Sequence, residues 1–268
     1  AELVCDFLSF MQPILDKAGL GDIKVTNGEP TNWYRFSFWG YADAIAENPD
    51  ALTNLGIITS HGFYVGGYDN RWYGSHTPKG IETLRSLRPG LHAWVTSTSW
   101  SRMDSRFIKE IWGNIYEAGV NGIIPWAGIQ RPPLWIGGDP NPGCAIRVSE
   151  DGKYEIMPGY YYYKQVSRAG QPGMKVAWTM SMDSELPVIA FASDRTGNSD
   201  SFVVVNTSLK SEKMIEITIK GTASDRFRLY RTSGNGENYS DIGETEVNDG
   251  KILYRAPANS ATTFFAVN

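Results

Sequence analysis

The stretch Gly56-Ile-Ile-Thr-Ser-His61-Gly-Phe-Tyr64 places a short apolar run directly before a polar and aromatic cluster. The stretch His92-Ala-Trp-Val-Thr-Ser97-Thr-Ser-Trp100 has the same form. Short apolar runs of this kind, followed by turn residues, are typical of strands buried in a parallel sheet. Both stretches therefore predict a strand that carries polar and aromatic side chains at its carboxyl end.

Two more strands are predicted on the same grounds, so that four are expected, at residues 23–26, 56–60, 92–96 and 122–125. The clusters that follow them begin at Glu29, His61, Ser97 and Trp126, at intervals of 32, 36 and 29 residues. A (β/α)₈ barrel uses roughly 250 residues for eight units, or about 31 for each. Residues 1–170 therefore have room for four βα units of a TIM barrel, which is half of one.

The segments on either side complete the predicted architecture. Apolar residues from Leu3 to Leu15 recur with helical spacing up to Gly19, with no capping residue or strand before them, as expected for a chain that starts inside a larger fold. A helix at Tyr160 to Val166 is followed by short alternating segments separated by turn residues. Residues 171–268 are therefore predicted to form an antiparallel β-sandwich. The fold class is α/β, half a barrel followed by a sandwich.

Composition excludes several classes of function. The net charge of -4 offers no basic face for nucleic acid. The 13% aromatic content, with nine Trp and fourteen Tyr, is found in saccharide-binding proteins and in ordinary aromatic cores. No stretch approaches the roughly 18 consecutive apolar residues of a membrane span, and residues at the N-terminus show neither the cationic start nor the Ala-rich cleavage site of a signal peptide. Cys5 and Cys144 permit one disulfide, but their spacing does not show that they meet.

Neither a metal site nor a cofactor site is predicted. The three histidines, His61, His76 and His92, lie in different contexts without ligand spacing, and no glycine-rich phosphate-binding loop occurs. Ser97 and His61 both lie at strand ends and would allow a Ser-His-Asp triad, although Ser97 lacks the Gly-x-Ser-x-Gly turn. A serine hydrolase therefore stays an alternative, and it would require Ser97 to react with a fluorophosphonate probe.

The two stretches quoted first resemble strands six and seven of glycoside hydrolase family 30, a family of retaining β-glycosidases with a TIM barrel and a β-sandwich. Four further segments resemble the same family in the same order: the helix from Phe10 to Leu20, the cluster of Glu29, Asn32 and Trp33, the segment Gly159 to Gly173, and the last strand from Ala256 to Phe264. The resemblance thus spans essentially the whole chain. It implies that the chain corresponds to the C-terminal half of the barrel plus the sandwich.

The resemblance places the catalytic nucleophile of the family at Ser97. Retaining glycosidases use two carboxyl groups about 5–5.5 Å apart, one as nucleophile and one as acid/base. The family has a glutamate at the end of strand seven, where this chain has serine. A neutral hydroxyl cannot replace that carboxylate, so the chain is expected to be inactive. Either a deliberate Glu→Ser substitution or a natural inactive homologue would explain the serine.

Glu29 in Asn27-Gly-Glu29-Pro30 looks like the acid/base of the family, which lies in an Asn-Glu-Pro motif after strand four. Glu29 lies only 32 residues before His61, however, which is one βα unit rather than two. Glu29 is therefore assigned to the end of strand five, where it would bind a sugar hydroxyl or orient a catalytic carboxylate. The acid/base glutamate is then not in this chain.

The remaining residues at the strand ends are expected to contact the saccharide. In barrel enzymes these ends form the active site, and aromatic rings stack on the apolar faces of sugars. Arg131 would pair with an acidic sugar, and Trp135 would serve where Trp126 does not. The expected substrate-binding residues are Glu29, Asn32, Trp33, His61, Tyr64, Trp100, Trp126, Arg131 and Trp135.

The leading hypothesis is a secreted or periplasmic retaining glycoside hydrolase for a β-linked oligo- or polysaccharide, with its nucleophile replaced. The alternative is a catalytically inactive carbohydrate-binding homologue. Half a barrel leaves an open sheet edge and an uncovered apolar face. The expected partners are therefore the saccharide and a complementary N-terminal half of the barrel, as a second chain or an omitted segment.

Overall fold

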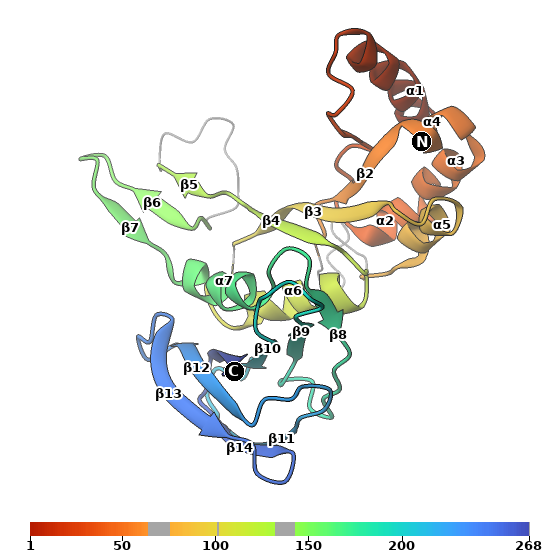
Figure 1. Ribbon diagram of the computed structural model, residues 1–268. Coiled ribbons are helices and arrows are strands. Elements are labelled where there is room, and N and C mark those ends of the chain that lie inside the picture. Colours follow the sequence, from red (N-terminus) through yellow and green to blue (C-terminus); the bar gives the residue numbers. More distant parts are fainter. Residues whose placement is uncertain (64–75, 101, 132–142, 268) are drawn as a thin grey trace. The chain divides into compact units, whose positions relative to one another are not determined.

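The computed structural model describes residues 1–63, 76–100, 102–131 and 143–267, and its chain forms two compact units (Figure 1). The first unit comprises Ala1–Ser99 and Gly113–Trp126. The second comprises Trp100–Trp112 and Ala127–Asn268. Their internal organisation matches the predicted fold class of a parallel α/β sheet followed by an antiparallel β region.

A parallel four-stranded sheet forms the centre of the first unit (Figure 1). Its strands lie in chain order, as successive βα units require, and they occur where the apolar runs predicted them. They are β1 (Val25–Thr26), β2 (Leu55–Ser60), β3 (His92–Ser99) and β4 (Gly122–Trp126).

Helices cover one face of this sheet. Strand residues such as Ile58, Ala93 and Val95 are fully buried against them in a single apolar core. The amphipathic helix predicted at the start of the chain is α1 (Glu2–Lys17). The other helices are α2 (Trp33–Phe38), α3 (Tyr41–Glu47) and α4 (Pro49–Asn54) between β1 and β2, and α5 (Lys79–Leu87) before β3. Helix α6 (Arg106–Tyr116) precedes β4, and its residues from Gly113 onwards belong to the first unit.

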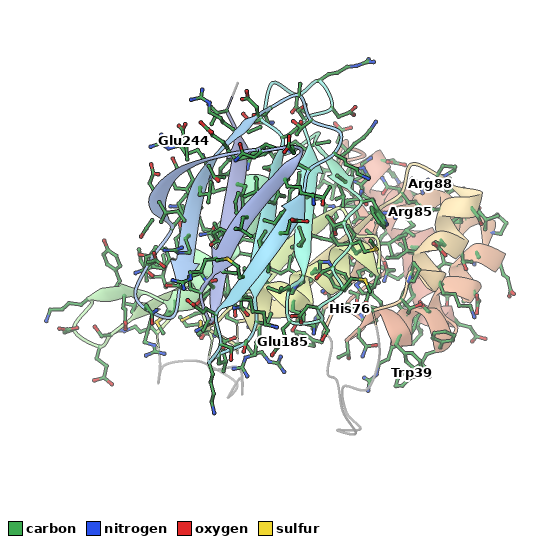
Figure 2. The ribbon with its side chains drawn as sticks, turned by 90° about the horizontal axis from the view of Figure 1, so that it is seen from below. Trp39, His76, Arg85, Arg88, Glu185 and Glu244 are labelled. Carbon is green, nitrogen blue, oxygen red and sulfur yellow. The ribbon has the colours of Figure 1, made fainter. Side chains whose placement is uncertain are left out.

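Arg85 of α5 and Arg88, which caps the carboxyl end of α5, bind backbone carbonyls at the amino ends of the strands (both are labelled in Figure 2). Each guanidinium carries several donors and can bind several carbonyls at once. Arg85 donates to the carbonyls of Leu91 and Gly119, and Arg88 to those of Leu52, Thr53 and Leu55. The amino ends of β2, β3 and β4 are thus tied to one helix, at the edge opposite the predicted site.

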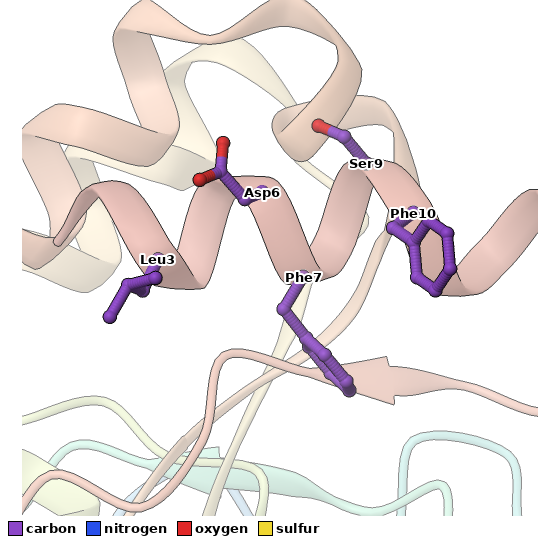
Figure 3. Close-up of a pocket in the computed structure, with 5 residues that line it drawn as sticks. All are labelled: Leu3, Asp6, Phe7, Ser9 and Phe10. Carbon is purple, nitrogen blue, oxygen red and sulfur yellow. The ribbon is translucent and has the colours of Figure 1, made fainter.

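One face of α1 is apolar and exposed (Figure 3). The exposed fractions of Leu3, Phe7, Phe10 and Ile14 are 82, 48, 66 and 44%. Residues at these intervals share one side of a helix, and the opposite side of α1 carries the buried Cys5 and Leu8. Helix α1 is therefore apolar on two sides, only one of which packs on the described part of the first unit.

An antiparallel six-stranded sheet dominates the second unit, in the order β13-β12-β15-β10-β9-β8. A two-stranded ribbon of β11 and β14 packs against it, so the predicted sandwich is confirmed. The six-stranded sheet consists of β8 (Lys175–Ala177), β9 (Val188–Ala192), β10 (Ser201–Asn206), β12 (Arg226–Ser233), β13 (Ser240–Glu246) and β15 (Ser260–Ala266). The ribbon consists of β11 (Lys213–Thr218) and β14 (Lys251–Ala256).

Aromatic rings fill the core of the sandwich. Phe264 is fully buried and stacks on Phe202, with ring centroids 4.5 Å apart and planes 9° apart. Tyr254 of the ribbon meets Phe264 edge to face at 5.1 Å. These contacts join the two layers, because Phe202 and Phe264 belong to the large sheet and Tyr254 to the ribbon.

The sequence patterns missed the two outer strands of the large sheet, β8 and β13. Strand β8 has only three residues, and β13 reads Ser-Asp-Ile-Gly-Glu-Thr-Glu, which is too polar to show an apolar alternation. Both are edge strands, and edges are commonly short or charged. The second unit also contains α7 (Pro158–Ala169), which was predicted at Tyr160–Val166, and a small sheet of β5 (Ile129–Gln130), β6 (Ile146–Val148) and β7 (Tyr154–Ile156).

Cys5 and Cys144 are both buried free thiols. Burial raises the pKa of each thiol. Within the described ranges, no helix has the length and apolar character needed to cross a membrane.

We predict that Phe264→Ala lowers the free energy of unfolding of the second unit by about 3–5 kcal/mol, the usual cost of removing a fully buried phenylalanine ring. The matched control is Leu253→Ala on β14, because Leu253 is 72% exposed. Its effect should stay within about 0.5 kcal/mol. Urea unfolding followed by circular dichroism measures both, and equal effects would contradict the proposed sandwich core.

Candidate functional site

Beyond the end of β1, the side chain of Asn27 forms hydrogen bonds to β2 in place of a backbone peptide unit. The Asn27 amide, which is 3% exposed, donates to the Thr59 carbonyl at 3.0 Å and accepts from the Thr59 N–H at 2.7 Å. This donor and acceptor pair is the one that a neighbouring peptide unit would offer to β2. Asn27 therefore continues the pairing of β1 with β2 after the regular strand has ended.

The chain then turns at Gly28, whose φ of 87° lies in the left-handed region that favours glycine. Beyond the turn, residues 29–31 run beside the end of β2. The His61 N–H donates to the Pro30 carbonyl at 2.9 Å, and the Phe63 N–H donates to the Thr31 carbonyl at 3.2 Å. The turn and these two bonds place Glu29 next to the residues that follow β2.

Glu29, His61 and Thr96 form a polar cluster at the carboxyl ends of β1, β2 and β3. Glu29 Oε2 lies 3.4 Å from His61 Nε2 and accepts a hydrogen bond from the Thr96 hydroxyl. The side chains of Glu29 and His61 remain 46% and 31% exposed. The cluster is therefore accessible, and its carboxylate, imidazole and hydroxyl suit the hydroxyl groups of a sugar.

Burial lowers the pKa of His61, and the Glu29 carboxylate opposes this effect without cancelling it. The imidazole is therefore predominantly neutral at pH 7. A neutral imidazole has one N–H donor and one acceptor nitrogen, so it can form a hydrogen bond with a sugar hydroxyl in either direction.

Ser97 lies at an irregularity of β3. Val95 pairs with Ile123 and Thr98 with Pro125, so that two residues, Thr96 and Ser97, lie opposite one residue of β4. This two-to-one pairing has the form of a β-bulge, and bulges often re-aim side chains next to active sites. Strict alternation from the buried Val95 would put Thr96 on the open face and turn Ser97 towards the helices. The alternation thus indicates the face on which Thr96 lies but not its contact with Glu29, and the sequence-based prediction did not include Thr96.

The geometry does not assemble a serine hydrolase triad from the described residues. In such a triad the histidine lies between the hydroxyl and the acid. Here the carboxylate of Glu29 lies between His61 and the Thr96 hydroxyl, and no hydrogen bond joins His61 to Ser97 within the described part of the chain.

Asn32 and Trp33, predicted as saccharide contacts, are structural residues instead. Asn32 is fully buried and caps α2 by accepting a hydrogen bond from the Arg35 N–H at 2.8 Å. Trp33 is 1% exposed and donates through Nε1 to Asn114 Oδ1 at 2.8 Å. Their position directly after Glu29 suggested a surface role, but α2 begins there and turns both side chains inward.

Trp100, another predicted contact, is 3% exposed in the second unit. Its ring packs on Phe107 and Tyr163, with centroids 5.2 and 5.6 Å away. Gly143 approaches the Trp100 backbone so closely that an added Cβ would lie 2.3 Å from its carbonyl carbon. Trp100 therefore anchors a tightly packed core and has almost no surface to offer a saccharide.

The other predicted contacts divide between the units. Trp126 ends β4 in the first unit and is 43% exposed, on the same face as Ile124 and opposite the buried core. Arg131 is exposed in the second unit and donates to the Glu150 carbonyl at 2.9 Å. Tyr64 and Trp135 lie outside the described residues.

Glu29 is the one carboxylate among the described residues 27–31, 61–63 and 127–131, which follow β1, β2 and β4. The described segment after β3 carries Asp104, which pairs with Arg106. A retaining glycosidase needs two carboxyl groups. The described residues also contain no group of three or more His, Cys, Asp or Glu side chains arranged to hold a metal ion. Among the described residues, the acidic group that joins the side chains at the ends of β2 and β3 is thus Glu29.

No family model matches the chain, and no curated protein matches it. Solved structures do match, along almost the whole chain. A glycoside hydrolase family 30 (GH30) endoxylanase from Clostridium papyrosolvens C71 is 20% identical with a TM-score of 0.71, and the match covers 99% of this chain and 60% of that one.

Two other structures give a similar result. The catalytic domain of GH30 xylanase C from Talaromyces cellulolyticus is 19% identical with a TM-score of 0.74, covering 98% of this chain and 56% of that one. The endo-β1,6-glucanase BT3312 is 18% identical with a TM-score of 0.62, covering 98% and 53%. The chain therefore has the fold of part of a GH30 structure and spans 53–60% of the length of these proteins.

We predict that His61→Gln reduces the loss of stability on acidification. Because the pKa of His61 is below its ordinary value of 6.5 in the folded chain, the unfolded chain binds more protons between the two values. The free energy of unfolding should then fall as the pH decreases through 6.5 towards the lowered pKa. His61→Gln removes the titrating group and should flatten this part of the curve.

Urea unfolding at several pH values on both sides of 6.5 measures the effect. The matched control is His92→Gln, which removes an exposed histidine at the opposite end of β3. An unchanged slope for His61→Gln would show that His61 has the same proton affinity in the folded and unfolded chains.

Proposed function

We propose that this chain supplies part of a saccharide-binding groove in a barrel of the glycoside hydrolase type. The Glu29–His61–Thr96 cluster carries the proposal. It lies at the carboxyl ends of neighbouring parallel strands, where barrel enzymes bind their substrates. The similarity in fold to GH30 structures supports a saccharide as the ligand.

A β-linked polysaccharide such as xylan is the first ligand to test. Two of the similar structures are described as xylanases and one as an endo-β1,6-glucanase. Glu29 would accept hydrogen bonds from sugar hydroxyls, and His61 would donate or accept one. Trp126 would offer part of its ring to the apolar face of a sugar. A secreted or periplasmic location remains a prediction.

We further propose that the chain as written binds the saccharide without hydrolysing it. Ser97 occupies the position that corresponds, by the sequence resemblance, to the nucleophilic glutamate. A hydroxyl without a neighbouring base is a weak nucleophile at neutral pH and carries no charge to stabilise an oxocarbenium-like transition state. Glu29, which follows β1 and accepts a hydrogen bond from Thr96 of β3, would remain as a carboxylate that binds the saccharide.

Four additional βα units would complete the groove. Two observations support this part of the proposal. One face of α1 is apolar and exposed, and about 40% of the length of each similar GH30 structure has no counterpart in this chain. The additional units would pack on Leu3, Phe7 and Phe10 and would contribute the acid/base glutamate. They could belong to a second chain or to the same polypeptide.

The first test is saccharide binding by Glu29→Gln in the complete protein. Charged hydrogen bonds contribute about 1.5–3 kcal/mol, so the affinity for xylo-oligosaccharides should fall by roughly 10- to 100-fold. Isothermal titration calorimetry measures it. The control is Glu216→Gln, which neutralises an exposed glutamate of the sandwich that pairs with Lys251. If Glu29→Gln and the wild type bind the saccharide with equal affinity, Glu29 does not contribute to saccharide binding.

The second test is Ser97→Glu in the complete protein. If the nucleophile is the missing element, this variant should hydrolyse the β-linked saccharide with retention of configuration, as followed by NMR of the anomeric protons. The uncharged Ser97→Gln has nearly the same size and should stay inactive. Binding without hydrolysis by Ser97→Glu would identify the protein as a carbohydrate-binding homologue whose other catalytic groups are also lost.

A further inference from the structure

The backbone directly after His61 is packed without any spare space. Gly62 has a φ of 68°. A Cβ added to it would lie 2.6 Å from Val95 Cγ2 and 2.7 Å from Asn114 Oδ1. Only glycine therefore fits between β3 and α6 at this point. The position of the following peptide unit depends directly on these two neighbours.

The peptide unit between Gly62 and Phe63 is held at both ends. Its N–H donates to the Thr31 carbonyl at 3.2 Å. Its carbonyl accepts from Asn114 Nδ2 at 3.0 Å and lies 3.3 Å from His76 Nε2 (His76 is labelled in Figure 2). Together with the bond from the His61 N–H to Pro30, these contacts fix the backbone on both sides of His61.

Trp33 determines which way the Asn114 amide points. The indole Nε1–H is a donor only, so the amide atom 2.8 Å from it must be the acceptor Oδ1. The amide NH₂ is then directed at Gly62. Trp33 is 1% exposed and Asn114 fully buried, so water cannot compete for these bonds. By orienting the Asn114 amide, Trp33 thus determines that Asn114 donates to the Gly62 carbonyl.

We propose that Asn114, oriented by Trp33, is a positioning residue for His61. It acts through the Gly62 carbonyl and keeps the imidazole beside Glu29. The inference rests on the proposed function, because it gives His61 a role in saccharide binding. The imidazole is itself partly exposed and reaches Glu29 at 3.4 Å. Its place in the cluster therefore depends mainly on the backbone that carries it.

The test compares Asn114→Leu with the wild type in the complete protein by NMR titration of His61. Leucine is close to asparagine in size, adds no charge and removes both hydrogen bonds. The His61 signal is assigned as the one that is lost in His61→Gln. Because burial is the larger influence on the pKa of His61, release of the loop should raise the titration midpoint towards 6.5. Affinity for xylo-oligosaccharides should fall by about fivefold, the low end for coupled sites.

The matched control is Asn206→Leu. Asn206 is also fully buried, and its amide donates to the carbonyls of Ser211, Ala256 and Pro257 in the second unit. This variant should lower stability without moving the His61 midpoint. A second variant, Trp33→Phe, keeps a buried ring but removes the indole N–H, and it should shift the midpoint in the same direction as Asn114→Leu. It serves as the test if Asn114→Leu does not fold.

The inference is overturned if neither Asn114→Leu nor Trp33→Phe moves the midpoint, or if Asn206→Leu moves it equally. Neither result depends on ligand binding. If the wild type binds no saccharide, the proposed function is refuted. The titration midpoint of His61 still tests whether Asn114 positions the imidazole.

Discussion

The arrangement of the site depends on the pairing of the Asn27 side chain with Thr59. Parallel strands bring their carboxyl ends to one edge of a sheet, but β1 has only two residues and ends early. The Asn27 amide supplies the missing donor and acceptor to β2. Because the pair is buried, each group left without a partner would cost about 1–3 kcal/mol. The turn at Gly28 and the alignment of residues 29–31 with the end of β2 follow from this link.

The carboxylate of Glu29 links the carboxyl ends of β1, β2 and β3. Glu29 contacts an imidazole from the end of β2 and a hydroxyl from β3. It remains partly solvated, because its side chain is 46% exposed. A partly exposed carboxylate has two oxygens and retains capacity for further hydrogen bonds. This capacity suits a group that accepts hydrogen bonds from sugar hydroxyls.

The two units bury apolar surface in different ways. In the sandwich, rings from the large sheet and the ribbon meet in one core around Phe264. In the first unit, the helices bury one face of the sheet, while the outer side of α1 and the face carrying Ile124 and Trp126 keep exposed apolar side chains. Parallel sheets are normally covered on both faces. Within the described residues, these two surfaces therefore remain uncovered.

The sequence by itself determined the four parallel strands, the long first helix and most of the sandwich strands, because burial of these segments produces apolar runs or alternation that can be seen without coordinates. It also singled out Glu29 and His61 near strand ends, and the structure brings their side chains within 3.4 Å of each other. Tertiary structure alone decided that Trp33 and Asn32 turn inward, that Thr96 contacts Glu29, and that Trp100 belongs to a packed core. The physical reason is that strand periodicity ends where the strand ends. Beyond that point, the direction of a side chain depends on caps, bulges and buried hydrogen bonds to residues far away in the chain, such as Asn114, and no local pattern records them.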